Sequence, residues 1–202
     1  MDRDAFWHLN DLIQDDPVFV STGKRPQRPS WYQLAVFLCR MGNKTGITAA
    51  SFASVSEGTV WLYTDRVCQA FRNIRDEHVY WPGHVERDEF SNAMADWGFP
   101  GCLGSADGTY IRLERRPSVN GYAYWCRKKM YAIIIQATVD HRGRITSYDY
   151  GWPGSVQDSR VFSSSHLWCH RRRYFRAHEY ILVDKGEFLF LARRDVSSLK
   201  DT

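Results

Sequence analysis

The sequence predicts an α/β protein in which a small helical region, residues 1–100, precedes a domain of strands and helices over residues 101–202. In the first region, apolar residues recur at the three-to-four-residue spacing of amphipathic helices. In the second region, apolar runs rich in β-branched and aromatic residues alternate with turn signals, which is typical of strands. Gly98, Pro100 and Gly101 mark the boundary between the two patterns.

Two helices are expected near the start of the chain. The apolar residues of 3–14 share one helical face. Residues 17–29 contain three prolines and a glycine, which predicts a loop. Ser30 is a good N-cap and Gly42 a plausible stop, so a second, largely apolar and buried helix is expected between them.

Residues 46–74 predict a short helix, a tight turn at residues 56–58 and a longer helix. This is the pattern of a helix-turn-helix, and an ordinary helical hairpin is the alternative. Phe52 is expected to face inward on the first helix. The outward residues of the second helix carry few positive charges for a helix that reads a DNA groove: Thr59, Trp61, Thr64, Arg66 and Arg72.

The region from residue 101 predicts three strands, a helix and a fourth strand. The second strand is almost continuously apolar, so we expect it to be buried on both faces. A hairpin turn should join it to the third strand. The expected elements are strands over 102–116, 129–140 and 145–154, a helix over 159–177, and a last strand that ends at Asp184.

The charge is unevenly distributed along the chain. Residues 1–100 carry 10 Lys/Arg against 13 Asp/Glu, whereas residues 101–202 carry 17 against 10. A polyanionic partner for the basic second half is one interpretation, and a solvated basic surface is the other.

The cysteines and the N-terminus indicate the compartment. Five widely spaced cysteines without a CxxC motif predict reduced thiols in a reducing environment. The first 16 residues are acidic and contain no long apolar run, so neither a signal peptide nor a membrane span is expected there. We therefore expect a soluble intracellular protein.

Three aspartates lie at or near the expected strands or their ends, where open α/β sheets build their sites. These are Asp107, Asp158 and Asp184. Carboxylates that converge repel each other unless they are protonated or bridged by a cation, and hard divalent ions prefer oxygen ligands. Each aspartate also has a structural interpretation, as a turn residue or as a helix N-cap.

Four stretches of the second half together resemble the catalytic domain of PIF/Harbinger-type transposases and their domesticated nuclease-like derivatives. They are SADGTYIRL, NGYAYWCRKKMYAIIIQATVD, ITSYDYGWPGSVQDSRVF and ILVDKGE, within about residues 102–190. The resemblance implies an RNase H-like fold and divalent-metal-dependent cutting and joining of DNA, with Mg²⁺ or Mn²⁺ as cofactor. It makes Asp107, Asp158 and Asp184 the catalytic, metal-binding carboxylates.

The resemblance is incomplete at its C-terminal end. Glu187 stands where the family usually has tyrosine, and the family's last glutamate ligand would lie beyond Thr202. We therefore expect an incomplete RNase H-like sheet, truncated before that glutamate. A catalytically inactive DNA-binding or partner-binding remnant of such a transposase is the alternative to an active endonuclease.

Basic residues next to the second strand fit a role in binding DNA phosphates. Arg127, Lys128 and Lys129 occupy the family's usual Arg-Lys position. The resemblance further implies a nuclear location and a helper DNA-binding protein as partner.

A rival metal site is also considered. His166 and His170 are four residues apart on an expected helix, with Cys169 beside them, and this spacing can hold zinc. No adjacent glutamate and no CxxC motif complete a familiar zinc site.

Overall fold

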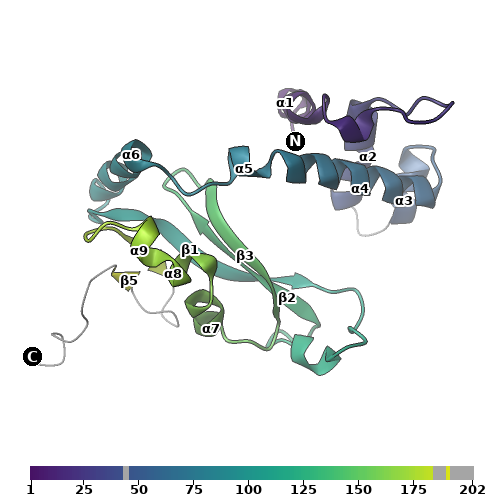
Figure 1. Ribbon diagram of the computed structural model, residues 1–202. Coiled ribbons are helices and arrows are strands. Elements are labelled where there is room, and N and C mark those ends of the chain that lie inside the picture. Colours follow the sequence, from purple (N-terminus) through teal and green to yellow (C-terminus); the bar gives the residue numbers. More distant parts are fainter. Residues whose placement is uncertain (43–45, 184–189, 192–202) are drawn as a thin grey trace, which may run out of the picture. The chain divides into compact units, whose positions relative to one another are not determined.

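The computed structural model describes residues 1–42, 46–183 and 190–191 (Figure 1). The chain forms two compact units, Met1–His78 and Val79–Thr202. The region 1–100, expected to be helical, thus covers the first unit and also the first helix of the second.

The described part of the first unit is helical, and it contains both helices expected near the start of the chain. Asp2 caps the first by accepting a hydrogen bond from the Ala5 amide at 2.8 Å. Buried apolar residues, among them Leu34 and Val67, hold the helices together. The elements are α1 (Arg3–Ile13), the 3₁₀ helix η1 (Pro17–Phe19), α2 (Ser30–Gly42), α3 (Gly46–Phe52), α4 (Glu57–Asn73) and α5 (Arg75–His78).

Helices α3 and α4 are the pair expected within residues 46–74. Ser56 caps α4, with its hydroxyl accepting from the Thr59 amide at 3.2 Å. The prediction that Phe52 faces inward is wrong, because its side chain is 81% exposed and the buried contacts of α3 are made by Ala49 and Ala50. DNA binding by this helix pair stays a prediction.

The second unit is a mixed sheet with helices, which confirms the predicted α/β class with an incomplete RNase H-like sheet. The described strands follow the order β3-β2-β1-β4-β5, with β1 parallel to β4 and the other neighbours antiparallel. The elements are α6 (His84–Ala95), β1 (Cys102–Arg112), η2 (Gly121–Tyr124), β2 (Ala132–Val139), β3 (Ile145–Pro153), α7 (Asp158–Ser163), α8 (His166–Cys169), α9 (Arg171–Tyr174), β4 (Tyr180–Val183) and β5 (Phe190–Leu191).

The expected helix over 159–177 is in fact three short helices, α7, α8 and α9. The chain ends one helix at Ser164 and starts the next with the hydroxyl of Ser165, which accepts from the Trp168 amide at 3.1 Å. Serine competes for backbone hydrogen bonds in this way, which favours caps over helix interiors. The second strand starts later than expected, at Ala132, because Lys129 has a left-handed backbone with φ of 56°.

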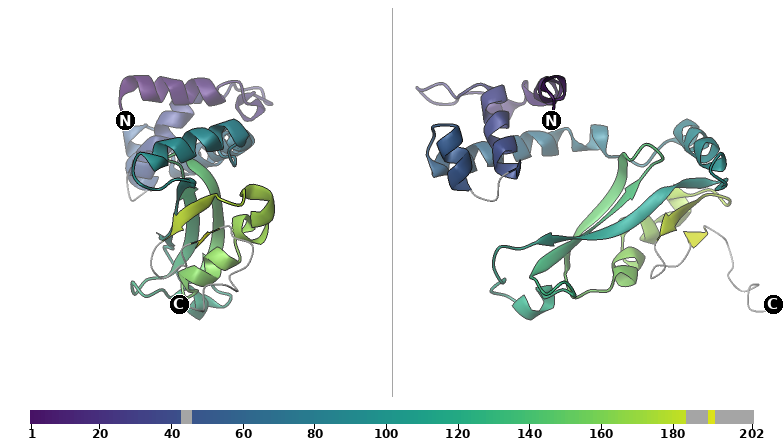
Figure 2. Two further views of the ribbon diagram at one scale, coloured as in Figure 1. Left: turned by 90° about the vertical axis from the view of Figure 1, so that its left-hand side faces the viewer. Right: turned by 180° about the vertical axis from the view of Figure 1, so that it is seen from behind.

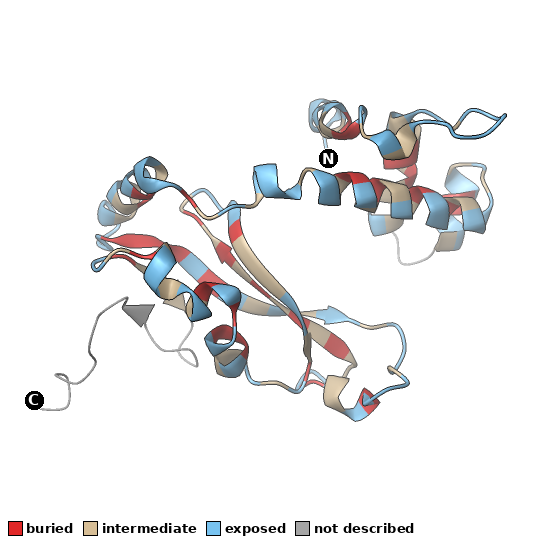
Figure 3. Ribbon diagram, viewed as in Figure 1, coloured by how far each residue is buried: buried red, intermediate tan, exposed pale blue. Residues whose placement is uncertain are grey.

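One face of the sheet is the better buried. Along β2, buried residues alternate with half-buried ones, so the expectation that both faces are fully buried is wrong (Figure 3). Helices α7, α8 and α9 gather along the buried face (Figure 2), where Phe162 and Leu167 pack against Ala106 of β1 and Ile181 of β4.

A bulge that requires a glycine determines which residues of β1 face each side of the sheet. Gly104 has φ of 145°, and a Cβ there would overlap the carbonyl oxygen of Val139. The pairing of β1 with β4 shifts register between Cys102 and Ser105 at this point. A bulge changes which residues of a strand face each neighbour, so Gly104 determines how the rest of β1 is presented.

Candidate functional site

Asp107 lies in the middle of β1 and is exposed. It is paired in register with Ala137 of β2. Its Oδ1 atom accepts a hydrogen bond from the amide of Gly108, with a nitrogen–oxygen distance of 2.7 Å. The carboxylate therefore bends along the strand toward the direction in which this amide points.

The direction of that amide follows from the sheet. The Leu113 amide donates a hydrogen bond to the Tyr131 carbonyl at 2.8 Å. In the antiparallel register of β1 and β2, the amides of the other odd-numbered residues at this end of β1 therefore also point toward β2. Alternate residues of a strand point their amides to opposite sides, so Gly108 points away from β2, toward the β4 side. The last described pair on that side is Ala106 with Val183. The Asp107 carboxylate thus lies at the β4 edge of β1, just beyond that pair.

Asp158 approaches the same stretch of β1 from the helix-covered face. It is the first residue of α7. Its Oδ1 atom lies 3.6 Å from where a Cβ on Gly108 would stand. Adjacent residues of a strand project to opposite faces of the sheet. Asp158 lies on the face toward which a Gly108 side chain would point, so the Asp107 Cβ lies on the other face. One cation could be reached by both only at the strand edge.

Asp184, the third predicted carboxylate, lies outside the described residues, as does Glu187. The described part of β4 ends at Val183, the residue directly before Asp184 in the sequence. The structure therefore brings Asp158 to the Asp107–Gly108 segment, and the placement of Asp184 stays a prediction.

Two of the three predicted basic residues lie beside Asp158 and Tyr110. Arg127 Nη2 lies 3.8 Å from Asp158 Oδ2, and the Arg127 side chain is 75% exposed. The Lys128 ammonium lies 5.4 Å from the centre of the Tyr110 ring. Burial, and then the charge of Asp158, raise the pKa of Tyr110, while Arg127 acts in the opposite direction. The Tyr110 hydroxyl is protonated at neutral pH, as tyrosine ordinarily is, and can donate a hydrogen bond.

An open pocket of about 450 Å³ lies beside these groups. Tyr110, Trp125, Arg127 and Asp158 line it, together with the loop that leads into α7. Reasoning from the sequence missed Tyr110 and Trp125 as site residues. The available signal was the interleaving of aromatic and basic residues in YAYWCRKKMY, which is typical of surfaces that bind nucleic acid strands.

Residues 106–190, which contain all three predicted carboxylates, match the family described as DDE superfamily endonuclease. This match lies within the second unit, which is called the DDE domain from here on.

The relatives of this DDE domain are longer proteins. The chain is 26% identical over 159 residues to "Putative nuclease HARBI1" from Homo sapiens and from Rattus norvegicus, covering 79% of this chain and 44% of each relative. It is 26% identical over 161 residues to "Protein ALP1-like" from Arabidopsis thaliana, covering 78% of this chain and 36% of that protein. The chain thus spans less than half the length of these relatives. No solved structure matches it significantly.

The donor chemistry of the DDE domain fits a hard cation, because its candidate ligands are carboxylate oxygens. Among the described residues, however, no three His, Cys, Asp or Glu side chains lie close enough to hold a metal. The zinc alternative gains no support either. His166 and His170 stack with ring centres 4.2 Å apart, and His170 Nδ1 lies 3.0 Å from the His166 carbonyl oxygen.

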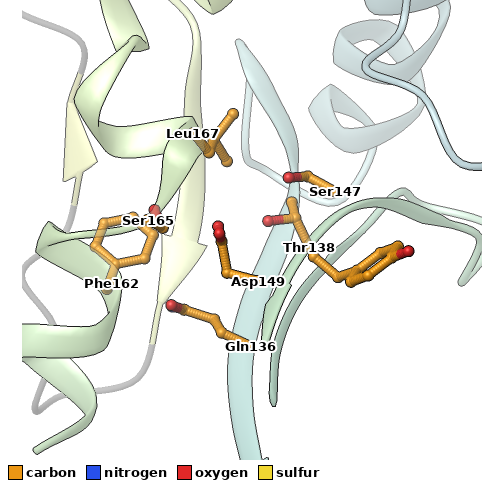
Figure 4. A pocket seen from close by; sticks show the side chains of 8 residues that line it. Gln136, Thr138, Ser147, Asp149, Phe162, Ser165 and Leu167 are labelled. Atoms are coloured by element: carbon orange, nitrogen blue, oxygen red, sulfur yellow. The ribbon is translucent and has the colours of Figure 1, made fainter. Parts of the chain in front are cut away.

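A second pocket of the DDE domain, shown in Figure 4, is only about 10 Å³ and lies between β2, β3 and the short helices. Asp149 in its wall accepts a hydrogen bond from the His166 amide at 3.0 Å. The Gln136 side-chain amide reaches none of the described residues with a hydrogen bond. The space suits one water molecule, so the open pocket is the stronger candidate for substrate.

Among the described residues, none of the helices has the length and apolar character needed to cross a bilayer.

Proposed function

We propose that the DDE domain is a transposase-derived DNA endonuclease that cleaves and joins phosphodiester bonds with the help of Mg²⁺ or Mn²⁺. The observation that carries this proposal is the match over residues 106–190, combined with two carboxylates that approach one segment of β1.

Asp107, Asp158 and Asp184 are the proposed ligands. When bound, a divalent cation lowers the pKa of a coordinated water and neutralises charge on the leaving oxygen. Asp107 would supply an oxygen at the β4 edge of β1, and Asp158 would approach that edge over Gly108, which has no side chain. Asp184 follows β4, the parallel neighbour of β1, in the sequence.

Arg127, Lys128 and Lys129 are proposed to bind the phosphates of the substrate. Arg127 lies beside Asp158, so a phosphate held by its guanidinium would be kept next to the carboxylates. A guanidinium can bind two phosphate oxygens at once, which orients the scissile bond as well as attracting it. Such contacts make binding weaken steeply with salt.

We also place the protein in the nucleus, with a helper DNA-binding protein that selects the target. The first unit supports the need for a helper, because residues 1–78 carry nine Lys/Arg against nine Asp/Glu. A surface without net positive charge attracts the DNA backbone only weakly.

A catalytically inactive partner-binding protein is the second candidate function. The observation that favours it is a set of exposed apolar residues on α3 and α4, namely Ile47, Phe52, Trp61 and Leu62. Exposed apolar side chains of this kind mark protein interaction surfaces.

Nicking of supercoiled plasmid DNA by the full chain tests the proposal. We expect nicking with Mg²⁺ or Mn²⁺ and none with EDTA, and we expect Asp107→Asn to abolish it. Asp96→Asn, in an exposed residue that caps the end of α6, is the matched control and should nick like the unchanged protein. Metal-dependent nicking that survives Asp107→Asn would refute the assignment, and salt-sensitive DNA binding without any nicking would favour the second candidate.

A further inference from the structure

The open pocket beside Asp158 has an aromatic wall that the cation site does not need. Trp125 is 47% exposed, and its indole packs edge-to-face on Tyr131 with ring centres 5.0 Å apart. The backbones of the same two residues form an isolated β-bridge. The exposed indole is thus held in place before any ligand arrives, which lowers the entropy lost when something stacks on it.

The floor of the pocket is also preformed. The Ser155 amide donates to the Ala123 carbonyl at 3.1 Å, and the Gly154 amide donates to the Ala132 carbonyl at 2.9 Å. A Cβ on Gly154 would lie 2.8 Å from two carbonyl oxygens, so only glycine lets the loop pack this closely. Ser155, Gln157 and Ser159, whose side chains carry hydroxyl and amide groups, also line the pocket.

The two charged residues that line the pocket differ in exposure. The Asp158 side chain is 36% exposed, and its negative charge disfavours a phosphate beside it. Arg127 is largely exposed, and Lys128 lies next to it in the sequence. A ligand with a neutral, flat, hydrogen-bonding part and an attached anion fits this arrangement. A volume of about 450 Å³ falls within the range of about 300–1,000 Å³ that small-ligand sites usually have.

We propose that this pocket holds one unpaired nucleotide of the DNA strand, with its base stacked on Trp125 and its phosphate directed to Arg127. Bases inside a duplex are stacked and cannot enter such a pocket, so the domain engages DNA that is locally unpaired beside the scissile bond. The proposal rests on the proposed function, since it takes DNA as the substrate, and it adds that the strand must open next to the cation site.

Binding measured in EDTA tests the pocket separately from cleavage. The probes are a fluorescein-labelled single strand of twelve nucleotides, a hairpin duplex of the same sequence, and a free mononucleotide as competitor. We expect Trp125→Ala to weaken single-strand binding by about 5- to 140-fold, the range that loss of one stacked base gives, and to change duplex binding far less. Trp97→Ala, which removes an 81% exposed indole elsewhere in the same unit, is the matched control.

Trp125→Phe guards against a trivial loss of folding, because it keeps a ring on Tyr131 and should retain most single-strand binding. Competition by the mononucleotide would show that the pocket also takes a free nucleotide, and no competition that it takes one only within a strand; both agree with an unpaired nucleotide as the ligand. Equal losses on single strand and duplex, or no loss for Trp125→Ala, would overturn the inference, as would a wild-type chain that binds neither probe.

The two proposals fail in different ways. If plasmid nicking depends on Asp107 while Trp125→Ala binds single strands normally, the endonuclease stands and the nucleotide pocket falls. If Trp125→Ala loses single-strand binding but no variant nicks DNA, the pocket stands and catalysis falls.

Discussion

Replacing Arg87 by methionine should destabilise the second unit, because it leaves a buried carboxylate without its main partner. Arg87 lies on α6, and its Nη1 atom is 3.0 Å from Glu179 Oε2. The two side chains are 7% and 2% exposed. Glu179 directly precedes β4, so this ion pair holds the strand beside β1 against α6 and supports the edge at which Asp107 lies.

The expected magnitude follows from what stays bound to Glu179. Breaking a buried ion pair by removing one partner costs about 3–5 kcal/mol. Arg176 still donates its backbone amide to Glu179 at 2.6 Å, with its Nε atom 3.5 Å from the carboxylate, so the lower end applies. About 3 kcal/mol corresponds to a fall in melting temperature of roughly 6–12 °C for a chain of this size.

Thermal unfolding of the full chain, followed by circular dichroism, measures this fall. Arg142→Met is the matched control. Arg142 pairs with Glu89, which lies on α6 as Arg87 does. Both side chains are about half exposed, and such pairs contribute at most about 1 kcal/mol. Arg87→Met combined with Glu179→Leu should recover much of the loss, because no buried charge then stays unpaired. An Arg87→Met protein that melts with the Arg142→Met control would refute the reasoning.

Three further predictions concern the bulge, the β2–β3 turn and the DNA contacts. Gly104→Ala should lower the melting temperature more than Gly143→Ala, since a Cβ at Gly104 meets the Val139 carbonyl whereas one at Gly143, which also has a positive φ, meets nothing within 4 Å; equal melting would contradict this. Burial raises the pKa of Asp140, but hydrogen bonds from Arg144 outweigh burial and hold it below its ordinary value of about 3.9. A lowered pKa stabilises the fold above the ordinary value, and the gain is lost as pH falls through the folded pKa. The melting temperatures of wild type and Asp140→Asn should therefore differ at pH 7 and converge as the pH falls below the ordinary value and through the folded pKa, and a constant gap would contradict this. Arg127→Gln should reduce the slope of log affinity against log salt by about one for duplex DNA, and an unchanged slope in a filter-binding titration would exclude a phosphate contact there.

Local sequence patterns predicted a helix or strand correctly wherever the residues of that segment alone decide its structure. The second predicted helix spans Ser30–Gly42, as its apolar pattern indicated. The cap was misassigned, because Ser30 is the first helical residue and its hydroxyl donates to Asn10 Oδ1 at 2.9 Å. The strands of the second unit likewise follow from their apolar runs. The helix expected over 159–177 failed because Ser165 starts a new helix, a choice that depends on how α7 and α8 pack on the sheet.

The sequence by itself determined the α/β class and nominated Asp107 and Asp158 as carboxylates of interest. Only the tertiary structure decided that Asp158 meets β1 at Gly108, from the face opposite the Asp107 side chain, and that Trp125 stands over a pocket beside it. The physical reason is that side-chain periodicity is a property of each segment, whereas convergence depends on strand register. Here that register passes through a bulge at Gly104, which no local pattern located.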